Sequence, residues 1–164
     1  MIVFGVAGWS GSGKTTLIEK LIPQFTARDI RVAVIKHAHH GFDLDRPGKD
    51  SYRHREAGAA QVLMLSNERW VLMNELRGAP EPTLDEQLQL LAPCDLVLIE
   101  GFKSAAVPKV EVYRPENGKP PLWQDNPHVV AVASDVAIDC PLPRLPLNDA
   151  AAIADFILDY APQP

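Results

Sequence analysis

The chain has few cysteines, less basic than acidic charge and no long hydrophobic run at its start. Its two cysteines, Cys94 and Cys140, have no CxxC spacing and offer no disulfide framework, which favours a reducing cytoplasm. The formal net charge of −5 argues against a nucleic-acid partner, because binding a polyanion needs clustered positive charge. The first apolar run has no basic segment before it and is too short for a membrane span or a signal core. We therefore expect a cytoplasmic protein with neither a nucleic-acid nor a membrane partner.

One segment of the chain matches the phosphate-binding loop G-x-x-x-x-G-K-[ST] in full, and it is Gly8-Trp9-Ser10-Gly11-Ser12-Gly13-Lys14-Thr15. The apolar run 1–7 before it is typical of a buried strand, and residues 15–22 after it have helical apolar spacing. Glycines let the backbone turn its N–H groups toward a phosphate, and the helix N-terminus adds further donors. The residues expected to bind the nucleotide here are Gly8, Ser10, Gly11, Ser12, Gly13, Lys14, Thr15 and Thr16. Lys14 would bridge the β- and γ-phosphates, and the Thr15 hydroxyl would bind Mg²⁺.

The segment 95–101 has the form of a Walker B strand, in which an apolar run ends in Glu100 and Gly101. A central parallel strand is buried on both faces, and its carboxyl end faces the ligand crevice. Glu100 is thus the second expected magnesium residue, and with Lys14 it is a candidate catalytic residue. Because Glu is longer than the usual Asp, it could reach the metal directly or through water, or act on the attacking water instead.

The remaining pattern predicts one three-layer α/β domain over residues 1–164, of the P-loop NTPase type with a mostly parallel central sheet. Strands are expected at 31–36, 61–65, 69–74 and 128–133, and helices at 50–58 and 83–91. Thr83 and Glu86 have the spacing of a capping box. Prolines make the segment around 114–127 a surface loop, and Asn148 is the expected N-cap of a last helix.

Asp135 follows the predicted strand 128–133, where many GTP-binding domains place the residue that recognises the base. A carboxylate accepts hydrogen bonds from guanine N1–H and its exocyclic amine, and adenine has no such pair of donors. Asp135 therefore favours GTP over ATP, although an Asp that merely turns a loop is an equal alternative.

The loop 37–49 gathers imidazoles and carboxylates at the carboxyl end of a predicted parallel strand, where ligands bind. Two interpretations stay open for it. The paired histidines could bind a transition metal, although no distant Cys or His cluster completes a four-ligand site. Alternatively the acidic residues join the Mg²⁺ or nucleotide shell, or the loop contacts a partner's substrate, while the basic residues contact an anion or lie on a solvated helix face. The candidate residues are His37, His39, His40, Asp43, Asp45, Lys49 and Arg53.

Several of these segments together resemble the molybdopterin-guanine dinucleotide biosynthesis adaptor protein B family. They are the phosphate loop, residues 36–40, Pro47-Gly48-Lys49-Asp50-Ser51-Tyr52-Arg53, Glu56-Ala57-Gly58-Ala59 and Leu98-Ile99-Glu100-Gly101-Phe102-Lys103. The resemblance spans most of the chain. Gly41 departs from it, because many relatives have an Asp after the paired histidines.

The resemblance implies a GTP-binding homodimer with at most weak GTPase activity and with Mg²⁺ as its metal. Its implied partner is the guanylyltransferase that joins GMP to molybdopterin, which the protein would assist by delivering GTP or by handing over cofactor, with molybdopterin itself as a possible contact. The sequence shows no motif-placed arginine finger or glutamine, which agrees with slow hydrolysis. Two alternatives remain from the residues alone: a small-molecule kinase whose Arg53, Arg55 and Arg114 form a lid, and a metallochaperone-like GTP switch that carries a metal on its histidines.

Overall fold

The computed structural model describes residues 1–38 and 41–160 and contains two compact units. The first unit joins residues 1–37 to those from 91 onward, and the second comprises residues 38–90. The single domain expected from chain length stays a prediction. Within the described residues, no helix is both long and apolar enough to cross a membrane.

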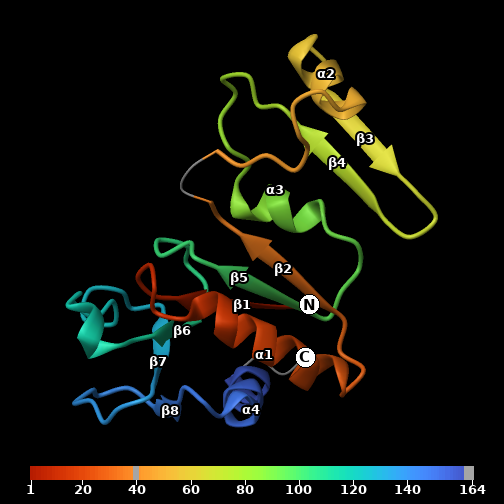
Figure 1. Ribbon diagram of the computed structural model, residues 1–164. Coiled ribbons are helices and arrows are strands. Elements are labelled where there is room, and N and C mark those ends of the chain that lie inside the picture. Colours follow the sequence, from red (N-terminus) through yellow and green to blue (C-terminus); the bar gives the residue numbers. More distant parts are fainter. Residues whose placement is uncertain (39–40, 161–164) are drawn as a thin grey trace. The chain divides into compact units, whose positions relative to one another are not determined.

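The first unit is built on a parallel sheet that has six strands in the described part of the chain, in the order β2-β5-β1-β6-β7-β8 (Figure 1). Its elements are β1 (Ile2–Ala7), α1 (Lys14–Thr26), β2 (Val32–Lys36), β5 (Leu96–Glu100), β6 (Lys109–Val112), the 3₁₀ turn η1 (Pro115–Asn117), β7 (Val129–Ser134), β8 (Arg144–Pro146) and α4 (Ala150–Tyr160). The predicted α/β fold with a mostly parallel sheet is therefore confirmed.

The main core lies between one face of this sheet and the helices α1 and α4. Alternation along β1 puts Phe4 and Val6 on that face, and both are fully buried. They pack in one cluster with Leu21 of α1 and Ile157 of α4, whose apolar residues recur at helical spacing. The last helix is capped by Asp149, whose side chain accepts a hydrogen bond from the backbone N–H of Ala152 at 3.0 Å. The prediction of Asn148 as the cap was wrong by one residue.

Two strands of the sheet, β6 and β8, were not predicted. The strand β6 lies between β1 and β7 although it carries Lys109 and Glu111, which are essentially buried. Both charged groups are hydrogen-bonded by loop backbone: the Lys109 ammonium donates to three carbonyl oxygens, and the Glu111 carboxylate accepts from Leu122 and Trp123 N–H groups. Charged residues are normally exposed, so the sequence of residues 109–112 did not predict a strand in the middle of the sheet.

The second unit contains α2 (Asp50–Glu56), the antiparallel hairpin of β3 (Gln61–Leu65) and β4 (Trp70–Asn74), and α3 (Leu84–Gln89). The hairpin was predicted, as was the capping box of α3. The Thr83 hydroxyl accepts from the Glu86 N–H, and the Glu86 carboxylate accepts from the Thr83 N–H at 2.7 Å. Local sequence signals were sufficient in this unit because the elements form between residues close together along the chain.

Candidate nucleotide site

The phosphate loop runs from the carboxyl end of β1 to the start of α1, as the sequence predicts. Gly8, Gly11 and Gly13 have φ values of 144°, 78° and 100°. A Cβ on Gly8 would lie 2.6 Å from both the Ser12 hydroxyl and the Val112 carbonyl oxygen, so only glycine fits there. At Gly11 nothing lies within 4 Å, so this side of the loop is open. The loop is thus closely packed at Gly8 and open at Gly11, where a ligand can approach.

Lys14, Thr15 and Glu100 lie together at this loop. The Lys14 ammonium donates to the Trp9 carbonyl oxygen at 2.9 Å, and the Thr15 hydroxyl donates to Glu100 Oε1 at 2.7 Å. Glu100 is 8% exposed, and its Oε1 also lies 3.3 Å from the Lys36 ammonium. Burial lowers the pKa of Lys14, although the Glu100 carboxylate opposes this shift. The expected magnesium pair is therefore in hydrogen-bond contact, with oxygen ligands of the kind that Mg²⁺ prefers.

The loop's other hydroxyls differ in burial. Ser12 is 1% exposed, and its Oγ has no hydrogen-bond partner among the described residues. Ser10 and Thr16 are exposed. A buried hydroxyl without a partner is costly unless a ligand or water meets it, so Ser12 fits a site that holds a polar group.

A wall beside the loop was not foreseen from the sequence. The Trp9 indole N–H donates to the Pro120 carbonyl oxygen at 2.7 Å, and the Lys103 ammonium lies 3.4 Å from the centre of the Trp9 ring. Lys119 is farther away, at 5.9 Å. The residues of this wall come from three loops far apart in the chain, and only the fold brings them together.

Asp135 follows β7 and pairs with Arg114, whose Nη2 lies 3.3 Å from Asp135 Oδ2. The same Nη2 lies 4.0 Å from the position of a Cβ on Gly13. Arg114 thus connects Asp135 with the phosphate loop. It borders a hollow of about 370 Å³ that is lined by residues 134–138 and 144–146. A larger hollow of about 770 Å³ at Lys20, Pro23 and the start of α4 includes none of the predicted site residues.

His37 is the residue of the predicted partner loop that lies in the same unit as the phosphate loop. Its backbone N–H donates to the Glu100 carbonyl oxygen at 3.2 Å, and its ring lies 4.6 Å from the Phe102 ring. His37 is thus placed next to the strand end that carries Glu100. His39 and His40 lie outside the described residues.

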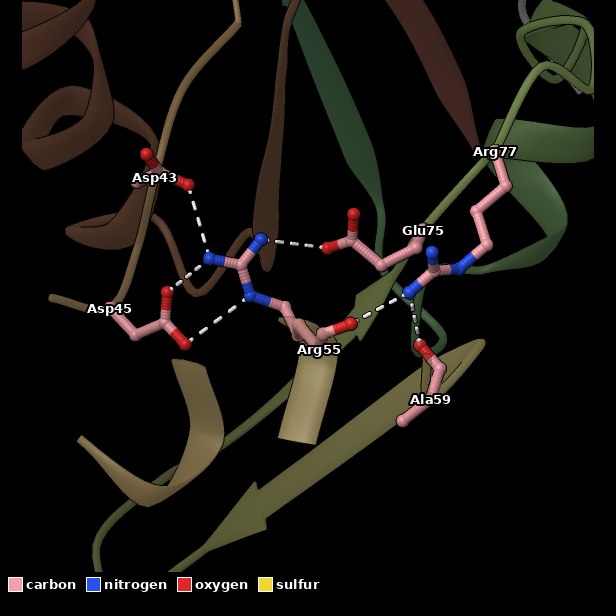
Figure 2. A network of polar contacts seen from close by, with 6 residues as sticks. All are labelled: Asp43, Asp45, Arg55, Ala59, Glu75 and Arg77. Carbon is pink, nitrogen blue, oxygen red and sulfur yellow. Dashed lines mark hydrogen bonds and ion pairs between the residues drawn. The ribbon is translucent and has the colours of Figure 1, made fainter. Parts of the chain in front are cut away.

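The acidic residues of that loop belong to the second unit, where they surround Arg55 (Figure 2). The Arg55 guanidinium donates to Asp43 at 3.1 Å, to Glu75 at 2.9 Å and to both oxygens of Asp45. Arg55 is 12% exposed at its side chain, and Asp45 is 3% exposed. The Arg55 hydrogen bonds lower the pKa of Asp45. These contacts give Asp43 and Asp45 a structural role within their own unit.

The basic candidates of the same segment are exposed. Lys49 precedes α2 as its N-cap residue, and the Arg53 guanidinium lies 3.8 Å from Asp50 one turn earlier. The kinase alternative places Arg55 with Arg53 and Arg114 in a lid; in the structure the Arg55 side chain is bound by three carboxylates. Among residues 1–38 and 41–160, no group of three or more His, Cys, Asp or Glu side chains could hold a metal ion.

Comparison with known proteins places this site in a family. The model of the family described as molybdopterin guanine dinucleotide synthesis protein B (MobB) matches residues 3–135. The chain belongs to the MobB family. The match includes the phosphate loop, Glu100, Lys103 and Asp135, and it ends at the last of these.

Two curated relatives are named molybdopterin-guanine dinucleotide biosynthesis adapter proteins. The Escherichia coli protein is 46% identical over 161 residues, with 94% of this chain and 90% of the relative covered. The Haemophilus influenzae protein is also 46% identical, with 96% and 88% covered. The chain is thus similar to members of the MobB family over nearly its full length.

Solved structures of the family have the same fold. A crystal structure of molybdopterin-guanine biosynthesis protein B has a TM-score of 0.76 at 27% identity, covering 96% of this chain and 99% of that one. A MobB homologue from Bacillus stearothermophilus has a TM-score of 0.71 at 27% identity, with 97% of each chain covered.

Proposed function

We propose that this protein is a GTP-binding adapter in the biosynthesis of molybdopterin guanine dinucleotide. The observation that carries the proposal is the arrangement of the phosphate loop with the Thr15–Glu100 contact of 2.7 Å. A loop of inward N–H groups, a lysine and a hydroxyl–carboxylate pair is the set of groups that a nucleoside triphosphate and Mg²⁺ require. Membership of the MobB family supplies the pathway.

Thr15 and Glu100 would hold the magnesium ion, and Lys14 would bridge the β- and γ-phosphates. To do so, the Lys14 ammonium must leave the Trp9 carbonyl oxygen, with which it is hydrogen-bonded now. The ion would supply positive charge against the phosphate oxygens. The partial neutralisation of Glu100 by Lys36 would limit the repulsion between that carboxylate and the phosphates.

The base would be guanine, recognised by Asp135 beside the hollow that it borders. In that arrangement guanine displaces the Arg114 guanidinium from the Asp135 carboxylate. Arg114 would then be free to approach the phosphates near Gly13. The proposed weak GTPase activity rests instead on the sequence, which has no motif-placed arginine finger or glutamine.

Calorimetric titration with GTP and with ATP, each with Mg²⁺, tests the nucleotide assignment. We expect a clear preference for GTP. Asp135→Asn should lower the affinity for GTP at least tenfold, because a lost hydrogen bond to a charged group costs about 1.5 to 3 kcal/mol, and should change ATP affinity little. Equal binding of both nucleotides by the unaltered protein would instead direct the search to a phosphoryl acceptor. Equal losses in the variant would overturn the role of Asp135 alone.

The partners follow from the same proposal. The protein would assist the guanylyltransferase that joins GMP to molybdopterin, without forming that bond itself, and molybdopterin could contact the chain during transfer.

The protein would act as a homodimer, and the exposed face of the hairpin β3–β4 supports this. On one of its faces, the cross-strand pairs Leu63–Leu72 and Leu65–Trp70 expose apolar side chains. An isolated hairpin with such a face is marginal unless something covers it.

A further inference from the structure

The charges that act on Lys14 of the phosphate loop are two lysines, Lys36 and Lys103, and one carboxylate, Glu100, although the chain as a whole is acidic. Lys36 is balanced by Glu100, at 3.3 Å. The ammonium groups of Lys36 and Lys103 both act on Lys14 and contribute to lowering its pKa. Lys103 lies on the ring of Trp9, a residue of the phosphate loop, yet it belongs to a different loop, three residues after Glu100.

The backbone at Lys103 is held in place from two sides. The buried Lys109 ammonium donates to the carbonyl oxygens of Phe102, Lys103 and Ala105 at 3.2, 3.1 and 2.6 Å. The Asn126 side-chain amide donates to the Lys103 carbonyl oxygen at 2.7 Å. Gly101 and Phe102 both have positive φ, of 92° and 42°. A non-glycine residue in that region is held there by its surroundings, so the position of Lys103 is specified rather than incidental.

The Lys103 side chain lies on an aromatic ring instead of in an ion pair among the described residues. Its ammonium is 3.4 Å from the centre of the Trp9 indole, within the phosphate loop itself. Burial lowers the pKa of Lys103 and the nearby charge of Lys119 adds to this, while the Glu111 carboxylate opposes it. A ring face attracts a cation less strongly than a phosphate does once both are out of water. Lys103 thus has a weak partner now and a stronger one within reach if an anion enters the loop.

We propose that Lys103 binds the terminal phosphate of the nucleotide, as a second lysine beside Lys14. When that phosphate is missing, the Lys103 ammonium lies on the Trp9 ring instead. This inference rests on the proposed function, since it requires that the loop binds a nucleotide. Lys103 follows the strand that carries the magnesium carboxylate, and segments after that strand contact the γ-phosphate in GTPases. Lys103 should therefore distinguish a nucleoside triphosphate from a diphosphate, and it should contribute little to binding the first two phosphates.

The test compares GTP and GDP binding, with Mg²⁺, in the unaltered protein and in Lys103→Gln. We expect the variant to bind GTP about tenfold more weakly, as for one lost charge-assisted hydrogen bond, and GDP less than twofold more weakly. Lys119→Gln is the matched control, because it removes the same charge 5.9 Å from the same ring. It should change neither affinity by more than about twofold, which is the size expected of a screened surface charge. Lys103→Arg should recover most of the GTP affinity.

Trp9 gives a second readout that does not depend on affinity. In a Trp70→Phe, Trp123→Phe background, Trp9 is the remaining tryptophan. Saturating GTP should change its fluorescence more than saturating GDP does, because the Lys103 ammonium leaves the ring only for the terminal phosphate. Equal losses of GTP and GDP affinity in Lys103→Gln, or equal effects of Lys103→Gln and Lys119→Gln, would overturn the inference and leave the proposed function intact. Failure of the unaltered protein to bind either nucleotide would overturn the proposed function, and this inference with it.

Discussion

At the scale of single residues, the phosphate loop contains one position, Gly8, where no larger side chain fits. Gly8 lies where β1 passes into the phosphate loop, against the Ser12 hydroxyl and the Val112 carbonyl oxygen. The carbonyl belongs to β6, so the fit joins the loop to the neighbouring strand. Gly11 has positive φ as well, but it borders open space. The two glycines therefore separate the cost of backbone strain from the cost of a steric clash.

We predict that Gly8→Ala destabilises the protein by about 3 kcal/mol, because the new methyl group meets backbone and the φ of 144° is strained for alanine. The matched variant Gly11→Ala should cost only about 1 kcal/mol, since it pays the strain alone. Urea unfolding of both variants measures the difference. Similar losses of stability in the two would show that the contact of Gly8 with Val112 has no energetic weight.

A second residue-scale prediction concerns pH. Asp95, just before β5, accepts hydrogen bonds from the Arg31 backbone N–H and guanidinium at 2.9 Å, and these lower the pKa of Asp95. A lowered folded pKa stabilises the protein fully above the ordinary Asp value of about 4, and the effect declines as the pH falls below it. Asp95→Asn should therefore lower Tm at pH 7, and its difference from the unaltered protein should narrow below about pH 4.

The control for this prediction is Glu68→Gln, which removes an exposed carboxylate lying 3.9 Å from Arg69. It should leave Tm unchanged at both pH values, as most exposed pairs do. A Tm difference for Asp95→Asn that is the same at pH 3 and pH 7 would contradict the role given to the ionised carboxylate.

At the scale of elements, β6 organises the loops beside the phosphate loop. The alternation of a strand puts Lys109 and Glu111 on one face of β6, while Val110 and Val112 join the core on the other. Lys109 holds the loop 101–105, and Glu111 holds the backbone of Leu122 and Trp123. Burial raises the pKa of Glu111, which is the cost of placing a carboxylate there. The strand thus uses two buried charges to fix two segments that have no regular structure of their own.

We predict that Lys109→Met loosens the loop that carries Lys103. The substitution fills a similar volume but removes a donor from three part-buried carbonyl oxygens. The oxygens of Phe102 and Lys103 keep a second donor, from Ala105 N–H and the Asn126 amide, whereas that of Ala105 loses the donor described for it, which should cost about 1 to 3 kcal/mol. Hydrogen exchange followed by mass spectrometry should show faster exchange of peptides covering residues 101–106. Lys20→Met, on the exposed side of α1, is the control and should change neither stability nor exchange. Unchanged exchange in Lys109→Met would show that the loop is held by other contacts.

At the scale of the whole molecule, the two units have different chemistry. The first contains the phosphate loop and the candidate base residue, and the second contains a buried arginine network and a hairpin with an apolar outer face. A GTP-binding adapter, as proposed above, would need both a nucleotide site and surfaces for other chains, and an exposed apolar face such as that of the hairpin is typical of such a surface. The exposed fraction is 66% for Trp70 and 73% for Leu65, which are paired across the two strands.

We predict that Trp70→Glu converts the proposed homodimer to a monomer at micromolar concentration, because a charge would be buried in the apolar contact. Sedimentation equilibrium of the unaltered protein and the variant measures this change. Gln61→Glu is the control on the same face of the hairpin, at its polar end beside Asn74, and should leave the dimer intact. A monomeric unaltered protein, or a variant that remains a dimer, would contradict the proposed contact.

The sequence by itself determined the phosphate loop, the Glu100 strand, the hairpin and the capping box of α3, because each signal lies within a few residues of chain. It also indicated the family, through several short segments together. Tertiary structure decided the rest. It placed β6 in the middle of the sheet despite its charges, because loop backbone supplies their hydrogen bonds. It paired Asp43 and Asp45 with Arg55. It also placed Lys103 on the ring of Trp9, although these two residues are 94 positions apart in the chain. Such pairings depend on which segments the fold makes neighbours, and no local pattern records that.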